Sequence, residues 1–157
     1  MPRLGDKEVM AVKQQPILRI QARNLITDLA LPALLTDEEG GLVFYNEAAG
    51  ALLGRRFEEV GPMSRDDWAH EYGPFDEDGR ALAADSLPIG GALRGGRPAQ
   101  GEFHVRLGEH GLRRVEVSAL PLMSMDRYDG SLVLFWPVED AAPGTNGHAT
   151  HAAAPGA

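Results

Sequence analysis

Three short apolar runs in the last third of the chain place the strongest constraint on its fold. Residues 102–107 and 114–119 alternate between apolar and polar side chains, which is the pattern of a strand with one buried face. Residues 132–136 are apolar on both faces, as expected of a central strand or of one covered on both sides. Turn residues at 108–111 and 125–130 separate the runs. The pattern predicts three antiparallel strands in a meander.

An earlier stretch predicts a hairpin followed by a helix. Leu34–Thr36 and Leu42–Tyr45 are rich in strand-forming residues, and the polar residues and two glycines of Asp37–Gly41 suit the turn between them. Asn46 can accept hydrogen bonds from the free N–H groups of a following helix, and Gly54 can end that helix. We therefore expect two strands and a capped helix here.

The remaining patterns are mostly helical. Residues 7–30 have helical apolar spacing, which Pro16 should break or kink, and Ser64 has the character of an N-cap. Residues 76–79 predict a turn, and residues 87–93 predict another helix. Strands first and last with helices between them predict an α+β fold, in which an antiparallel sheet carries its helices on one face.

Composition limits the domain organisation and the kinds of site. The chain has 157 residues, of which 43% are apolar, and this suits one domain with its own core. We expect a helical, basic arm at 1–24, the domain at 25–140 and a disordered tail rich in alanine and glycine at 141–157. The chain has no cysteine, so disulfides, thiolate metal sites and cysteine nucleophiles are excluded. With no apolar leader or membrane span in the sequence, we expect a cytoplasmic protein.

The formal charge of −8 is unevenly distributed along the sequence. Residues 1–23 hold five basic and two acidic side chains, residues 24–140 hold ten basic and twenty-one acidic ones, and the remainder holds none. These regions therefore carry +3, −11 and 0. A domain this acidic repels phosphate backbones, so we expect no direct binding to nucleic acid.

Taken together, these features resemble the PAS domain, a small sensory module of signalling proteins. The resemblance covers residues 25–140 and is carried by the turn before Asn46, the helix that ends at Gly54, the helix Leu87–Leu93, the strand entry at Gly111–Arg114 and the run Ala119–Leu122. It implies a five-stranded antiparallel sheet of order 2-1-5-4-3 with helices that enclose a pocket. It also implies that the N-terminal helix forms a homodimer or docks on a signalling partner.

Within that fold we expect an apolar pocket that binds a small apolar or aromatic ligand. The alternative is a core filled by the same side chains. The candidate pocket residues are Leu87, Ile89, Leu93, Phe103, Val105, Val117, Ala119 and Leu134.

Other chemistry is poorly supported by the sequence. The flavin-binding and coumarate-binding relatives of this family react through a cysteine, which this chain lacks. For haem, His70 is the nearest helical candidate for an axial ligand, but we expect it on an exposed helix face and His104 on a polar strand face. His148 and His151 lie in the tail without carboxylates, so we expect no metal site there.

We therefore expect a non-catalytic sensory or interaction module that acts by binding a small ligand, by dimerising, or by docking on a signalling partner without an effector domain of its own. Two alternatives stay open. One is a haem-binding PAS sensor, and the other is a small acid/base enzyme on an α+β cone, which would need an ionisable side chain on an inward strand face.

Overall fold

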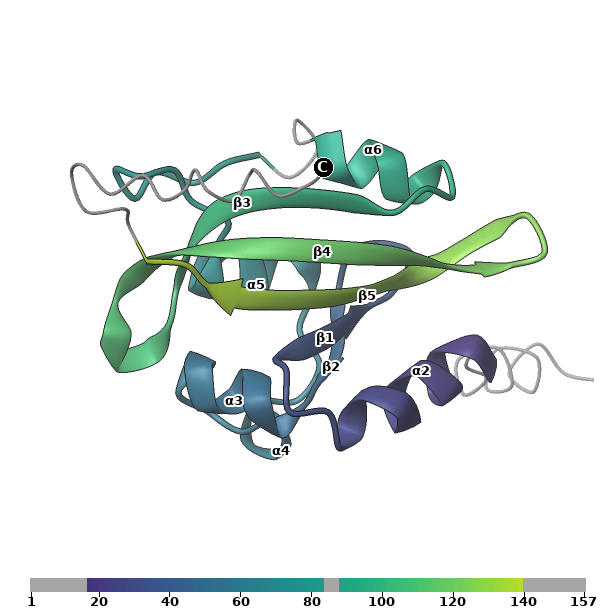
Figure 1. The fold of residues 1–157 in the computed structure, drawn as a ribbon, viewed down its shortest axis with the longest axis horizontal. Coiled ribbons are helices and arrows are strands. Elements are labelled where there is room, and N and C mark those ends of the chain that lie inside the picture. Colours follow the sequence, from purple (N-terminus) through teal and green to yellow (C-terminus); the bar gives the residue numbers. More distant parts are fainter. Residues whose placement is uncertain (1–16, 84–87, 140–157) are drawn as a thin grey trace, which may run out of the picture.

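A computed structural model of the protein describes residues 17–83 and 88–139, which form a five-stranded antiparallel sheet with short helices packed on it (Figure 1). The strand order is β2-β1-β5-β4-β3, which confirms the predicted fold class and sheet order. The elements are α2 (Ile17–Thr27), β1 (Ala33–Thr36), β2 (Leu42–Tyr45), α3 (Glu47–Leu53), α4 (Phe57–Val60), α5 (Arg65–Tyr72), α6 (Pro88–Arg94), β3 (Ala99–Arg106), the 3₁₀ turn η2 (Gly108–His110), β4 (Leu112–Ser124) and β5 (Arg127–Pro137).

The predicted hairpin is present as β1 and β2, and side-chain hydrogen bonds hold its turn. Asp37 Oδ1 accepts from the backbone N–H of Glu39 at 2.9 Å and of Gly41 at 2.8 Å, while Gly40 takes a φ of +87°. Asn46 caps α3, since its side-chain oxygen accepts from the N–H of Ala49. The predictions for this hairpin and for the start of its helix are confirmed.

The hairpin of β4 and β5 is longer than the sequence predicts. The pattern of turn residues spans 125–130, yet only two residues separate the end of β4 from the start of β5. The buried carboxylate of Asp129 explains the difference, because it accepts from the Ser124 hydroxyl on β4 and from Arg127 Nε, at 2.8 Å, on β5. The bond from Ser124 links the two strands just beside the turn, where the paired region continues past Leu122 and Gly130.

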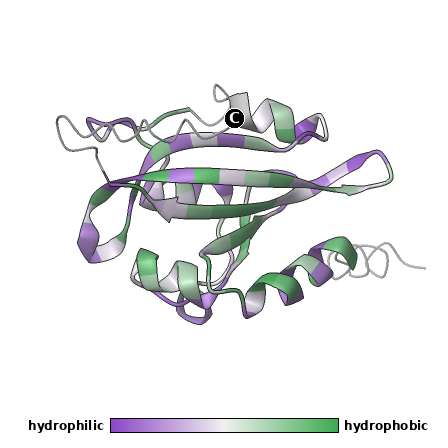
Figure 2. Ribbon diagram, viewed as in Figure 1, coloured by the Kyte–Doolittle hydropathy of each residue, from purple (hydrophilic) through white to green (hydrophobic). Residues whose placement is uncertain are grey.

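The central strand β5 is largely hydrophobic (Figure 2), and its residues pack into two separate apolar clusters, as its sequence predicts. Phe135 belongs to an apolar cluster with α3, α5 and the inner residues of β4, and Val133 packs against that cluster. Leu132 belongs to a second cluster with Ala22 and Ile26 of α2, and Leu134 packs against this one. The sheet therefore has apolar layers on both sides, which accounts for the unbroken apolar run.

Helix α2 is fastened to the sheet by one arginine as well as by apolar packing. Arg19 Nη2 donates to the backbone oxygen of Asp129 at 2.8 Å and to Glu38 Oε1 at 3.2 Å.

The sequence predicts this helix over residues 7–30, and its part before residue 17 lies outside the described residues, as does the tail from residue 141. Among the described helices, none is long and apolar enough to cross a membrane.

Asp129 also provides a test of the hairpin through pH. The hydrogen bond from Ser124 lowers the pKa of this carboxyl, and the bond from Arg127 lowers it further. A lowered folded-state pKa means that the ionised carboxylate stabilises the fold above the unfolded-state pKa of about 3.9, and that this contribution is lost as the pH falls through the folded-state value. Between about pH 7 and about pH 3, the free energy of unfolding of wild type should therefore fall more than that of Asp129→Asn.

Urea unfolding at each pH measures this difference. Asp28→Asn, at an exposed position after α2, is the matched control and should show the same pH dependence as wild type. Equal pH dependence of wild type and Asp129→Asn would show that this carboxylate does not stabilise the hairpin.

Candidate functional site

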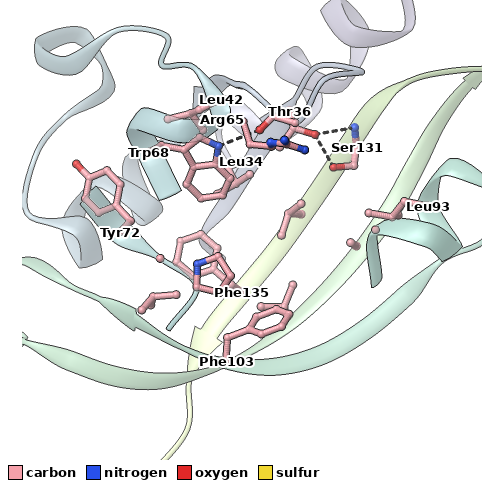
Figure 3. A pocket seen from close by; sticks show the side chains of 18 of the residues that line it. Leu34, Thr36, Leu42, Arg65, Trp68, Tyr72, Leu93, Phe103, Ser131 and Phe135 are labelled. Atoms are coloured by element: carbon pink, nitrogen blue, oxygen red, sulfur yellow. Dashed lines mark hydrogen bonds between the residues drawn. The ribbon is translucent and has the colours of Figure 1, made fainter. Parts of the chain in front are cut away.

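A cavity of about 220 Å³ lies between the inner face of the sheet and helices α5 and α6 (Figure 3). Its wall is mostly apolar and combines side chains from all five strands with others from the two helices. The apolar and aromatic residues that line it are Leu34, Leu42, Leu53, Trp68, Tyr72, Leu93, Phe103, Val105, Val115, Val117, Ala119, Tyr128, Val133 and Phe135. A cavity of this size suits a ligand smaller than the drug-sized molecules that fill pockets of roughly 300–1,000 Å³.

Most of the candidate pocket residues that the structure describes line this cavity. They are Leu93, Phe103, Val105, Val117 and Ala119. Leu134 instead packs against the cluster beneath α2, because neighbouring residues of a strand point to opposite faces, and Val133 and Phe135 take the inward positions on β5. Leu87 and the side chain of Ile89 lie outside the described part of the chain.

Helix α5 contributes two aromatic side chains that the sequence pattern does not assign to the pocket. Trp68 Nε1 donates to the backbone oxygen of Gly40 at 2.9 Å, and this bond holds α5 against the turn between β1 and β2. Tyr72, at the end of the same helix, lines the cavity on another side (Figure 3). Trp68 and Tyr72 are four residues apart, about one helical turn, and this spacing places them on the same face of a helix. The segment Arg65–Tyr72 has low overall amphipathicity, however, so its sequence does not indicate which face is buried.

Besides the charged residues Glu38, Arg65 and Arg94, the lining contains a pair of buried aliphatic hydroxyl groups. Thr36 on β1 and Ser131 on β5 are paired neighbours in the sheet, and their side-chain oxygens lie 2.7 Å apart. Thr36 Oγ1 also accepts from the backbone N–H of Ser131 at 3.2 Å. Both residues are buried, and Figure 3 shows them side by side, away from Phe103 and Phe135.

Tyr45 lies behind the cavity wall near α3, in the same apolar cluster as the lining residue Tyr72. Burial raises the pKa of Tyr45 to about 12, and the nearby Tyr72 adds to this shift. The Tyr45 hydroxyl donates to the backbone oxygen of Arg55 at 2.6 Å, which ties β2 to the segment after α3. Burial also raises the pKa of Tyr72. Both phenols are therefore protonated at neutral pH and can only donate or accept hydrogen bonds.

The sequence matches no protein-family model and no curated protein, but the structure is similar to several solved ones. The PAS domain of BvgS from Bordetella pertussis is 19% identical, with a TM-score of 0.53 over 82% of this chain and 90% of that one. The chain has the PAS fold. A LOV protein from Rhodobacter sphaeroides is 17% identical, with a TM-score of 0.64 over 86% of this chain and 74% of its own. The PAS domain of nitrogen regulation protein NR(II) from Vibrio parahaemolyticus is 14% identical, with a TM-score of 0.53 over 73% of this chain and 95% of its own.

The lining of this PAS fold does not fit haem. Haem iron requires an axial ligand such as histidine, cysteine, methionine or tyrosine. His70 is exposed, and neither it nor the half-buried His104 is among the residues that line the cavity. Tyr72 and Tyr128 do line it, but burial raises the pKa of Tyr72, and a cavity of about 220 Å³ is smaller than the pockets that hold even drug-sized molecules. Within residues 17–83 and 88–139, no group of three histidine or carboxylate side chains could hold a metal ion either.

Proposed function

We propose that this protein is a non-catalytic sensory module of signal transduction that binds a small ligand in the cavity of its PAS fold. The observation that carries the proposal is the apolar cavity itself, which combines an aromatic wall with a hydrogen-bonded pair of buried aliphatic hydroxyl groups. Apolar pockets with a few convergent polar groups are the usual form of small-molecule sites. The similarity to a PAS domain of a nitrogen regulation protein supports a role in signalling.

The lining supports binding rather than acid/base catalysis. Glu38 is the carboxylate among the described lining residues, and it accepts a hydrogen bond from Arg19 while its side chain stays 59% exposed. A carboxylate that acts as a general base in such a site is typically buried in an apolar pocket, whereas Glu38 faces solvent. We further propose that the protein is cytoplasmic, because it lacks cysteine, and that its acidic charge keeps it from nucleic acid.

Filling the cavity should abolish ligand binding. Ala119 is buried in its wall, and a phenylalanine there would occupy much of the free space. Isothermal titration with 2-naphthol should show binding to wild type and a dissociation constant at least about tenfold higher for Ala119→Phe. Leu120→Phe, on the opposite face of the same strand and 43% exposed, is the control and should bind like wild type. Equal binding by Ala119→Phe would place the ligand elsewhere.

We also propose that α2 mediates homodimerisation or docking to a signalling partner. One face of this helix packs on the sheet through Ala22 and Ile26, yet Ile17 and Leu25 are each 71% exposed and Ile20 is 47% exposed. Large apolar side chains gathered on one short helix are typical of an interaction surface.

A charge on this surface should disrupt a homodimer. Light scattering should report the dimer mass for wild type and the monomer mass for Leu25→Glu, because a buried carboxylate without a partner costs several kcal/mol. Gln100→Glu adds the same charge at an exposed position on β3, outside this helix, and should leave the mass of the dimer unchanged. A dimer that persists in Leu25→Glu would contradict the proposal for this helix.

A further inference from the structure

The hydroxyl pair of Thr36 and Ser131 has hydrogen-bonding capacity that the protein does not use. Two hydroxyl groups carry two hydrogens and four lone pairs. One hydrogen and one lone pair form the bond between the side chains, and one lone pair of Thr36 accepts from the N–H of Ser131. Whichever hydroxyl donates within the pair, one hydrogen and two lone pairs have no partner among the described residues.

This unused capacity lies in a buried place. Ser131 is 2% exposed and Thr36 is 6% exposed, and both line the cavity. A buried hydroxyl hydrogen without an acceptor costs free energy, and a ligand oxygen placed beside it recovers that cost. The rest of the wall, from Trp68 to Phe135, offers mainly apolar contact. The cavity is therefore suited to a molecule with an apolar body and one polar end.

The charges around the cavity favour a neutral polar end. A buried carboxylate needs a cation beside it, since an unpaired one is strongly disfavoured. Arg65 lines the cavity but is already engaged in another interaction, and Arg94 is exposed to solvent. Glu38 also lines the cavity, but it is acidic and already accepts from Arg19, so it offers an anion no donor. A neutral hydroxyl or carbonyl group avoids the free-energy cost of burying an unpaired charge.

From these observations we infer that the ligand is a small neutral alcohol, phenol or ketone whose oxygen binds the Thr36 and Ser131 hydroxyl pair, and that this pair selects it over hydrocarbons of the same shape. The inference rests on the proposed ligand-binding function. Since a cavity of about 150 Å³ holds the six heavy atoms of benzene, one of about 220 Å³ holds at least about nine. A bicyclic aromatic compound with one hydroxyl group, with about eleven heavy atoms, is close to this size.

Three probes test the inference by isothermal titration. They are 2-naphthol, its equally sized hydrocarbon counterpart 2-methylnaphthalene, and the slightly larger anion 2-naphthoate. For wild type, the dissociation constant of 2-naphthol should be about fivefold lower than that of 2-methylnaphthalene, as one net hydrogen bond provides. The anion 2-naphthoate should bind more weakly than 2-naphthol.

The double variants Thr36→Val/Ser131→Ala and Thr36→Ala/Ser131→Ala remove both hydroxyl groups and should bring the ratio of the first two dissociation constants to about one, because a single hydroxyl left behind could still bind the ligand oxygen. Either double variant answers the question if the other fails to fold. Ser118→Ala is the control, because Ser118 lies between Val117 and Ala119 on β4 and so points away from the cavity. It should keep the preference of wild type.

The outcomes separate this inference from the proposed function. Binding of 2-naphthol and 2-methylnaphthalene with equal affinity, or a preference that survives in both variants, would overturn the role of the hydroxyl pair while leaving the cavity as a ligand site. Tighter binding of 2-naphthoate would overturn the neutral class. Failure of all three probes to bind wild type would instead contradict the proposed function.

Discussion

Replacement of Asn46 by alanine should lower the free energy of unfolding by about 3 kcal/mol, because one side chain serves three parts of the fold. Asn46 is 2% exposed, and its oxygen accepts from the N–H groups of Ala33 and Ala49 at 3.1 and 3.0 Å. Its amide nitrogen donates to the backbone oxygens of Ile26, Leu29 and Leu31. The substitution leaves a helix without its cap and buried backbone groups without partners.

Urea unfolding of wild type and Asn46→Ala measures this loss. Asn24→Ala makes the same change at an exposed position within α2 and should stabilise the protein slightly, since alanine favours the helix. A loss below about 1 kcal/mol for Asn46→Ala would mean that water replaces these bonds and that the side chain is not the junction between α2, β1 and α3.

Replacement of Gly130 by alanine should destabilise the protein by about 4 kcal/mol or prevent folding. Gly130 has a φ of +130°, a conformation that side chains rarely adopt. A Cβ atom there would overlap the backbone oxygen of Thr36 and lie 3.0 Å from the Cα of Asp37. Both neighbours are backbone in the hairpin of β1, so they cannot move aside without separating β1 from β5.

Gly91→Ala is the matched control for this prediction. Gly91 lies in α6 with an ordinary φ and with open space where a Cβ atom would lie, so alanine there should stabilise the helix by up to about 1 kcal/mol. Thermal unfolding compares the two variants directly. Near-native stability of Gly130→Ala would show that β1 and β5 are not held as closely as the contact implies.

Much of the fold was predictable from short stretches because the interactions that build them are local. The side chain of Asp37 binds N–H groups two and four residues away, and that of Asn46 binds one three residues away. Ser64 likewise caps α5 through Asp67. Such bonds depend on the residue types alone, so the hairpin and the helix starts followed from their order.

The residues that line the cavity were only partly predictable. Alternation of apolar and polar residues along a strand shows that its two faces differ, but it does not show which helix covers each face. For the alternating strands β3 and β4, polar residues marked the outer face, and the inward residues Phe103, Val105 and Val117 do line the cavity. For β5 both faces are apolar, so the pattern could not separate Leu134 from Val133.

By itself, the sequence determined the strands, the turns, the capped helices and the absence of cysteine chemistry, since these depend on neighbouring residues and composition. Only the tertiary structure decided the polar end of the cavity. Thr36 and Ser131 are separated by 95 positions, and they meet because β1 pairs with β5 at the middle of the sheet. Nothing near either residue specifies the other, so their hydrogen bond exists only once the sheet has formed.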